Sequence, residues 1–137
     1  MKMYRVIQND FSGVKEIKLE DFKKLNSKEI IIVDVRNSKE QSISMIKGAI
    51  TLDQFEKNPN KYKDKKIIAY CTIGYRSGKF VKEISKKGFD AYNLEGSILG
   101  WIHHQGPLVD QNKQQTKRIH VYGSSWDLPP DGYTSTH

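Results

Sequence analysis

Thirteen consecutive residues carry the strongest structural signal in this chain, and they read Lys66-Ile67-Ile68-Ala69-Tyr70-Cys71-Thr72-Ile73-Gly74-Tyr75-Arg76-Ser77-Gly78. Residues 67–70 form an apolar run of the length that is typical of a buried strand. Ser77 is expected to be the N-cap of a helix that stops at Gly88. The only cysteine of the chain, Cys71, therefore stands between a buried strand and a helix.

The loop from Cys71 to Arg76 is expected to curl so that its backbone N–H groups point inward. Such a loop binds anions, and the positive end of the following helix adds to this effect. Gly74 is expected to serve the loop through its backbone, at a positive φ. A thiolate is favoured in these surroundings, and the thiolate is the nucleophile in cysteine chemistry. The alternative is that Cys71 is a buried apolar side chain, as free cysteines commonly are.

Strand-like and helix-like patterns alternate outward from this stretch, which indicates an α/β domain with a mostly parallel central sheet. The continuous apolar run over 30–35 predicts a strand that is covered on both faces. Ser38 is expected to cap a short helix, with Gln41 completing a capping box. Strands are expected over 14–17, 30–35, 49–51, 67–70 and 91–94, and helices over 19–25, 52–57 and 98–102.

The composition changes after Pro107. Residues 111–115 are polar and typical of a turn, and 118–122 alternate like a strand, which predicts a hairpin with Leu108-Val109. Residues 126–137 contain Pro-Pro and Asp-Gly pairs and are expected to be extended or loose.

Four short segments stand in a recognisable order: Ile31-Ile32-Val33-Asp34-Val35-Arg36, Ile46-Lys47-Gly48-Ala49-Ile50, the cysteine loop, and Leu94-Glu95-Gly96-Ser97 followed by Trp101. They resemble the Asp-x-Arg, Ile-x-Gly-Ala, active-site and Leu-x-Gly-Gly motifs of the single-domain rhodaneses, a family of sulfurtransferases. The resemblance covers residues 12–109. It implies a rhodanese-like α/β fold, with a mostly parallel central sheet and helices on both faces, between an N-terminal extension over 1–11, with a possible edge strand, and a C-terminal extension over 110–137.

The resemblance also implies an enzyme. It would move sulfane sulfur from a donor, such as thiosulfate or a persulfide, to a thiophilic acceptor, such as cyanide, a thiol or a protein. A persulfide on Cys71 would carry the sulfur. The substrate-binding and persulfide-binding loop would consist of Thr72, Ile73, Gly74, Tyr75, Arg76 and Ser77.

Asp34 and Arg36 are supporting candidates at the end of an expected strand. Either they touch substrate, or they form a buried ion pair that braces the cysteine loop. The second interpretation is preferred, because buried charges generally occur in pairs.

The sequence departs from the family pattern in two ways. Met45 replaces the usual histidine, and the loop positions Thr72 and Ile73 are uncharged. An apolar loop with one arginine is suited to a thiol or protein persulfide better than to thiosulfate.

Two other functions remain open. One is a sulfur-relay or interaction module with little turnover of small molecules. The other is a phosphatase or arsenate reductase, although such enzymes typically place five residues between the cysteine and the arginine. Here four residues, 72–75, separate Cys71 from Arg76.

The composition fits one small domain. The chain has 137 residues, a net charge of +7 and a pI of about 9.4. Its lysines are spread along the chain, with one local cluster: Lys57, Lys61, Lys63, Lys65 and Lys66. The cluster is interpreted as a solvated turn before a strand, because no nucleic-acid motif accompanies it, so no nucleic-acid partner is expected. No apolar run is long enough to span a bilayer, so no membrane partner is expected. A single cysteine excludes an internal disulfide and a multi-cysteine zinc site, and no metal or cofactor is expected. No signal-peptide or membrane-spanning pattern is recognised, which favours the cytoplasm.

Overall fold

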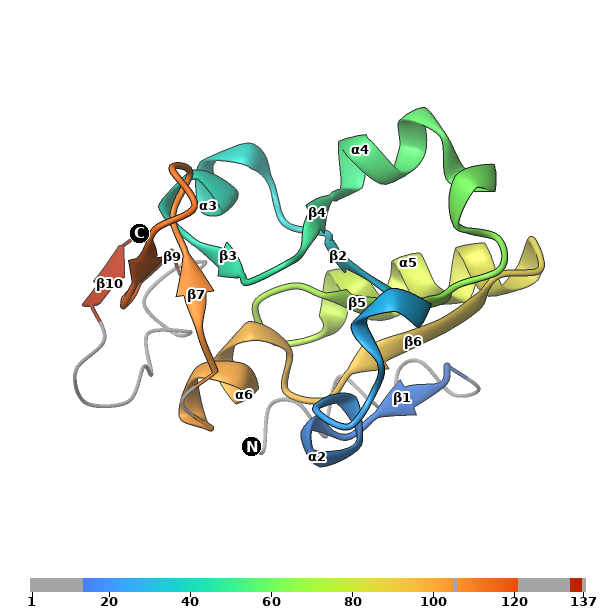
Figure 1. Cartoon of the computed structure of the whole chain (residues 1–137), viewed down its shortest axis with the longest axis horizontal. Helices are drawn as coiled ribbons and strands as arrows, with labels where there is room; N and C mark the ends of the chain where they lie inside the picture. Colours follow the sequence, from blue (N-terminus) through green and yellow to red (C-terminus); the bar gives the residue numbers. More distant parts are fainter. Residues whose placement is uncertain (1–13, 105, 121–133, 137) are drawn as a thin grey trace.

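A five-stranded parallel sheet forms the centre of the computed structural model, which describes residues 14–104, 106–120 and 134–136 (Figure 1). The strand order is β1-β6-β5-β2-β4. The strands are β1 (Glu16–Ile17), β2 (Ile30–Asp34), β4 (Ile50–Thr51), β5 (Lys66–Tyr70) and β6 (Asp90–Leu94). Each of them overlaps a strand expected from the sequence, and the α/β fold with a parallel sheet is confirmed.

Helices connect the strands and pack on both faces of the sheet (Figure 1). They are α2 (Leu19–Phe22), α3 (Ser38–Ile43), α4 (Leu52–Lys57), α5 (Tyr75–Lys86) and α6 (Ser97–His103), with the 3-10 turns η1 (Ser27–Glu29) and η2 (Pro59–Tyr62). The bounds of α4 agree with the expected helix over 52–57.

Side chains of β5 alternate between two hydrophobic cores, because successive residues of a strand point to opposite faces. Ile67 and Ala69 pack with residues of α4, η2 and α5, whereas Ile68 and Tyr70 pack with residues of α2 and α6. All four side chains have no solvent exposure. The apolar run therefore reflects a central strand that is covered on both sides.

The helix after the cysteine loop begins earlier than expected. Its N-cap is Gly74, at φ +110°, and not Ser77. Ser77 lies in the first turn of α5, where it is buried and donates a hydrogen bond to Asn93 Oδ1 at 2.6 Å. The hydrogen bond to Asn93, which is distant in the sequence, thus outweighs the local preference of Ser77 for the cap position.

The cap of α3 also differs from the expectation. Asn37, one residue before Ser38, is the N-cap and forms a capping box with Glu40. Gln41 instead donates to the carbonyl oxygens of Asp34 and Arg36, at 3.0 and 2.9 Å. The expected box was wrong because both Asn and Ser are good caps, and only Asn37 has a glutamate three residues later.

A small antiparallel sheet joins the end of the chain to its middle. Strand β7 (Leu108–Val109) pairs with β3 (Met45–Ile46) and with β8 (Gln115–Thr116). The expected hairpin of residues 118–122 with Leu108-Val109 was wrong, since β8 is the partner of β7. The turn closes early because Asp110 Oδ1 accepts hydrogen bonds from the backbone N–H groups of Asn112 and Gln114.

The segment after this hairpin forms a separate pair. Strand β9 (Arg118–His120) runs parallel to β10 (Thr134–Thr136). Residues 1–11, and residues 126–133 of the tail expected to be extended or loose, lie outside the described part of the chain.

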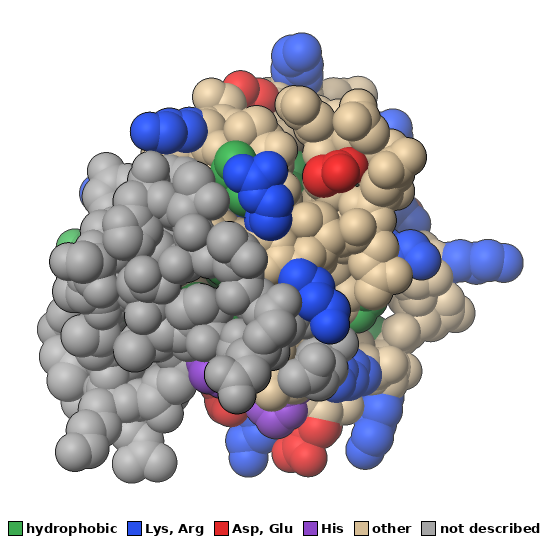
Figure 2. Space-filling view, turned by 90° about the vertical axis from the view of Figure 1, so that its left-hand side faces the viewer, with side chains coloured by type: hydrophobic (Ala, Val, Ile, Leu, Met, Phe, Trp, Pro, Cys, Tyr) green, Lys and Arg blue, Asp and Glu red, His purple; other side chains and the backbone are tan. Residues whose placement is uncertain are grey.

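The surface carries many separate basic side chains. On the face in Figure 2, Lys and Arg side chains stand apart, with Asp, Glu and uncharged side chains between them. Lys63 and Lys65 each donate to a backbone carbonyl, of Lys87 at 2.7 Å and of Lys28 at 2.6 Å. Within residues 14–104, 106–120 and 134–136, no helix is long and apolar enough to span a membrane.

Phe55 on α4 offers a test of the core between the sheet and α5. Its ring is 2% exposed and lies 5.5 to 5.6 Å from the ring centroids of Tyr62, Phe80 and Phe89. We expect Phe55→Ala to lower the free energy of unfolding by about 3 to 5 kcal/mol, through lost burial and a residual cavity. Urea unfolding followed by circular dichroism measures it. Glu56→Ala, at the exposed neighbouring position, is the control, and equal losses for the two variants would contradict this description of the core.

Candidate active site around Cys71

Cys71 directly follows β5, the middle strand of the sheet. The residue is 1% exposed. Gly74 then turns the chain at φ +110°, a conformation that favours glycine, and α5 starts at Tyr75. The expected positive φ of Gly74 is confirmed. The cysteine consequently lies at the carboxyl end of a parallel strand, where α/β sheets commonly place their sites.

The sulfur of Cys71 contacts two uncharged donors. The backbone N–H of Gly74 donates to Sγ at 3.1 Å, and the Ser77 hydroxyl lies 3.5 Å from it. The positive end of the α5 dipole faces the same loop. The sulfur therefore has hydrogen-bond donors and a helix N-terminus directed at it.

The cysteine loop is fastened to the start of α6 and to β6. Ile98 N–H donates to the carbonyl oxygen of Cys71 at 3.0 Å, and Leu99 N–H donates to that of Thr72 at 3.2 Å. Asn93 Nδ2 donates to the carbonyl oxygen of Gly74 at 3.1 Å. These hydrogen bonds fix the backbone on both sides of the sulfur.

Arg76 is held by a carboxylate that the motifs did not reveal. Glu40 of α3 has no solvent exposure, and its two carboxylate oxygens accept from Nη1 and Nη2 of Arg76 at 2.7 and 2.9 Å. The Thr72 hydroxyl donates to Glu40 at 3.2 Å and accepts from Arg76 at 3.1 Å. The loop arginine is therefore part of a bidentate ion pair.

The two partners shift each other's pKa. Burial raises the pKa of Glu40, but the hydrogen bonds and charge of Arg76 outweigh it, so that the pKa lies below its ordinary value. Burial lowers the pKa of Arg76, but Glu40 and the nearby Cys71 raise it above its ordinary value. The pair therefore stays ionised over the neutral range.

Asp34 and Arg36 form a second, fully buried ion pair. Arg36 Nη2 lies 2.8 Å from Asp34 Oδ2, and neither side chain is exposed to solvent. The Tyr70 hydroxyl donates to the same carboxylate at 2.6 Å and accepts from Ile46 N–H at 3.0 Å. Burial and the negative charge of Asp34 raise the pKa of Tyr70 well above its ordinary value. This network joins β2, β5 and β3 behind the cysteine loop.

The remaining loop side chains differ in exposure. Thr72 and Ile73 are buried, at 2% and 6%, while Tyr75 is 50% exposed. A hollow of about 390 Å³ borders Arg76 on the side of α3 and α4. It is lined by Val35, Arg36, Asn37, Ser38, Gln41, Leu52, Asp53 and Arg76.

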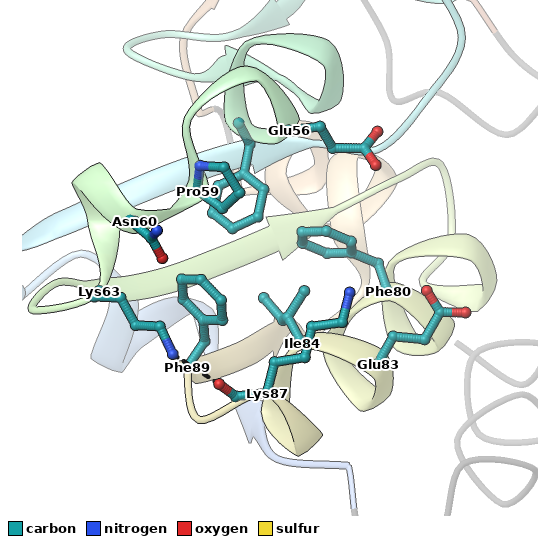
Figure 3. Close-up of a pocket in the computed structure, with 10 residues that line it drawn as sticks. Glu56, Pro59, Asn60, Lys63, Phe80, Glu83, Ile84, Lys87 and Phe89 are labelled. Carbon is teal, nitrogen blue, oxygen red and sulfur yellow. Dashed lines mark hydrogen bonds between the residues drawn. The ribbon is translucent and has the colours of Figure 1, made fainter.

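A second hollow, of about 410 Å³, lies away from the cysteine loop, between α4 with η2 and α5 (Figure 3). The rings of Phe80 and Phe89 face it, and Lys63 closes one side through its hydrogen bond to Lys87. In the described part of the chain, no group of three or more His, Cys, Asp or Glu side chains is arranged to hold a metal ion.

The structure thus places the predicted loop residues in two groups. Cys71, Gly74 and Ser77 meet at the sulfur, whereas Thr72 and Arg76 meet at Glu40. Sequence reasoning missed Glu40, Asn93 and Ser97. Two of them had a local signal: Glu40 stands three residues after the cap-forming Asn37, and Ser97 stands where the Leu-x-Gly-Gly motif has its second glycine.

The sheet order and the cysteine loop define an α/β domain with a candidate cysteine nucleophile at the end of its central strand. The sequence model of the rhodanese-like domain matches residues 19–104, and the chain belongs to the rhodanese-like family.

Solved structures agree with this assignment. The chain is similar to a rhodanese-related protein from Thermoplasma volcanium, with 28% identity and a TM-score of 0.61, over 69% of this chain and 97% of that one. It is also similar to a rhodanese-like domain protein from Staphylococcus aureus, with 33% identity and a TM-score of 0.56, over 64% of this chain and 91% of that one. A thiosulfate sulfurtransferase from Pseudomonas aeruginosa shares the fold, with a TM-score of 0.65 at 17% identity, over 90% of this chain and 25% of that one.

Curated relatives of similar sequence are named for a hydroxylase activity and not for sulfur transfer. The chain is 33% identical over 114 residues to the tRNA uridine(34) hydroxylase of Acholeplasma laidlawii, which covers 76% of this chain and 35% of the relative. It is 37% identical over 99 residues to the protein of that name from Onion yellows phytoplasma, which covers 63% of this chain and 32% of the relative. The chain therefore spans about a third of the length of these relatives. Because their names specify a tRNA substrate, the expectation that excluded nucleic acid finds no support.

The ion pair of Glu40 and Arg76 predicts a pH-dependent contribution to stability. The folded pKa of Glu40 lies below its ordinary value of 4.5, so the contribution is complete above that value and is lost as the pH falls through the folded pKa. We expect Glu40→Gln to be less stable than the parent by about 1 to 3 kcal/mol at neutral pH, and the gap to shrink in acid. Urea unfolding over a pH series measures it.

The matched control is Glu83→Gln, which removes an exposed carboxylate on α5. A stability gap for Glu40→Gln that stayed constant from neutral pH into acid would show that this carboxylate does not act through its charge.

Proposed function

We propose that this chain is a rhodanese-type sulfurtransferase domain in which Cys71 carries sulfane sulfur as a persulfide. The observation that supports it is the placement of the thiol at the end of β5, with the Gly74 N–H at 3.1 Å from sulfur and the start of α5 beside it. These neutral donors and the helix dipole stabilise an anionic sulfur without forming an ion pair with it.

The transfer takes two steps. The Cys71 thiolate attacks the outer sulfur of a donor R–S–SH, a new S–S bond forms, the donor S–S bond breaks, and R–S⁻ leaves. A nucleophilic acceptor then attacks the outer sulfur of the Cys71 persulfide and takes it, and the Cys71 thiolate is the leaving group. With thiosulfate as donor the leaving group is sulfite. Neither step requires an external oxidant or reductant.

The loop favours a donor of low charge. Its arginine, Arg76, already faces the buried carboxylate of Glu40 through two hydrogen bonds. Thr72 and Ile73 are uncharged and buried. A doubly charged thiosulfate therefore meets little uncompensated positive charge from these side chains, and a thiol persulfide or a protein persulfide is the better substrate class.

The phosphatase interpretation is less well supported. A tetrahedral oxyanion needs several donors directed at one point. Here four residues separate Cys71 from Arg76, and the guanidinium is directed at Glu40. A sulfur relay to a partner protein uses the same Cys71 persulfide and differs only in the acceptor.

A second candidate is action on tRNA. The observation that favours it is the name shared by curated relatives, tRNA uridine(34) hydroxylase, together with the net charge of +7. Positive charge draws in nucleic acid, although charge alone gives no selectivity.

Cys71→Ser tests the sulfur-transfer proposal. We expect intact mass spectrometry of the parent protein to show a reducible gain of one sulfur atom after incubation with a thiol persulfide, with a smaller gain after thiosulfate. The variant is expected to show none, because the serine hydroxyl does not form a persulfide. Thermal unfolding of both proteins is the control for folding.

A parent protein that gains no sulfur from either donor would overturn the proposal. A sulfur gain that persists in Cys71→Ser would overturn the assignment of the nucleophile, since the chain has no other cysteine.

Fluorescence anisotropy tests the second candidate. Action on tRNA predicts that purified tRNA binds more tightly than a homopolymeric RNA of equal length, at the same salt concentration. Equal and strongly salt-suppressed binding of both would indicate charge attraction alone and would contradict this candidate.

A further inference from the structure

Ser97 stands in a backbone conformation that L-residues rarely adopt. Its φ is +50°, it directly follows Gly96 at φ +74°, and it is the first residue of α6. The segment resembles a Leu-x-Gly-Gly pattern in which glycine holds this position. Glycine would adopt the conformation without strain, so the serine side chain needs a separate explanation.

The Ser97 hydroxyl is directed at the cysteine loop. Ser97 is fully buried, and its Oγ accepts a hydrogen bond from the backbone N–H of Cys71 at 3.2 Å. The same oxygen lies 3.5 Å from Ser77 Oγ. Ser97 thus contacts both the nucleophile's own backbone and the hydroxyl beside its sulfur.

Ser77 has one proton and two acceptors for it. Asn93 donates its Nδ2 to the Gly74 carbonyl, so its Oδ1 faces Ser77 and accepts the Ser77 proton at 2.6 Å. The second acceptor is Cys71 Sγ, at 3.5 Å from Ser77 Oγ. While Ser77 donates to either of them, its oxygen is able to accept from Ser97.

We propose that Ser97 is a positioning residue for Cys71: its hydroxyl fixes the Cys71 N–H and supports Ser77, which turns its proton from Asn93 to the sulfur when the thiolate forms. No covalent bond changes in this step, and each hydroxyl keeps its own proton. The inference deepens the proposed function, on which its role in sulfur transfer rests.

Ser97→Gly separates this role from a purely structural one. Glycine relieves the strain at φ +50°, which offsets the loss of the hydrogen bond from the Cys71 N–H, so the melting temperature is expected to change little. Alkylation of the single cysteine by iodoacetamide is expected to slow about fivefold near neutral pH, which corresponds to the net contribution of one hydrogen bond. The midpoint of its pH–rate profile is expected to move to higher pH.

Two further variants keep the test decisive. Ser77→Ala is expected to shift the pH–rate profile in the same direction, and the double variant Ser77→Ala/Ser97→Gly is expected to change it by less than the sum of the two. Ser85→Ala, at an exposed position of α5, is the matched control and leaves the profile unchanged.

Alkylation requires no sulfur donor, so the result of this test does not depend on whether the protein takes up sulfur. A Ser97→Gly protein that retains its melting temperature and the parent pH–rate profile would overturn the positioning role, even if the parent forms a persulfide. A shifted profile in a protein that takes up no sulfur would leave the positioning role of Ser97 in place and overturn the sulfurtransferase proposal alone.

Discussion

Two carboxylates without solvent exposure impose the main constraint on this structure. Asp34 and Glu40 each lie at 0% exposure, and a buried carboxylate costs several kcal/mol unless a cation and hydrogen-bond donors accompany it. Arg36 accompanies the first and Arg76 the second. Since Arg76 belongs to the cysteine loop and Glu40 to α3, the loop is unable to move away from α3 without leaving a buried charge unpaired. The position of the nucleophile is therefore fixed electrostatically from one side.

The other side of the loop is held by uncharged groups. Asn93, Ser97 and the first N–H groups of α6 hold the backbone of the cysteine loop, and the Gly74 N–H and the Ser77 hydroxyl contact the sulfur. The sulfur is thus surrounded by neutral donors, while the nearest loop cation is balanced by its own carboxylate. This arrangement suits a reaction in which sulfur arrives and leaves with its charge little changed, because neither the thiolate nor the persulfide form is locked in by a strong counter-ion.

Local patterns in the sequence sufficed for part of this structure. The β5 run, the α4 bounds and the positive φ of Gly74 followed from hydrophobic spacing and backbone preference, which act within a few residues. The ion pair of Glu40 and Arg76 did not follow, because the two residues are 36 positions apart and meet only when α3 packs on the loop. The two expected caps failed for different reasons. At α3, Asn37 and Ser38 both satisfy the local rule, and only Asn37 has a glutamate three residues later. At α5, Ser77 hydrogen-bonds to Asn93, which is 16 positions away, and Gly74 takes the cap position.

Two departures from local rules occur beside the same sulfur. Ser77 is a cap-forming residue that lies inside the first turn of its helix, and Ser97 is an L-residue at φ +50°. Either departure alone has an ordinary structural explanation, since Ser77 has Asn93 as partner and a short turn tolerates strain. Their hydroxyls, however, lie 3.5 Å from each other, and both contact Cys71. Conflicts between local preference and observed structure are expected at functional sites, where an interaction offsets the strain. The convergence of both on one cysteine therefore points to the reactivity of Cys71 as the reason for the conflict.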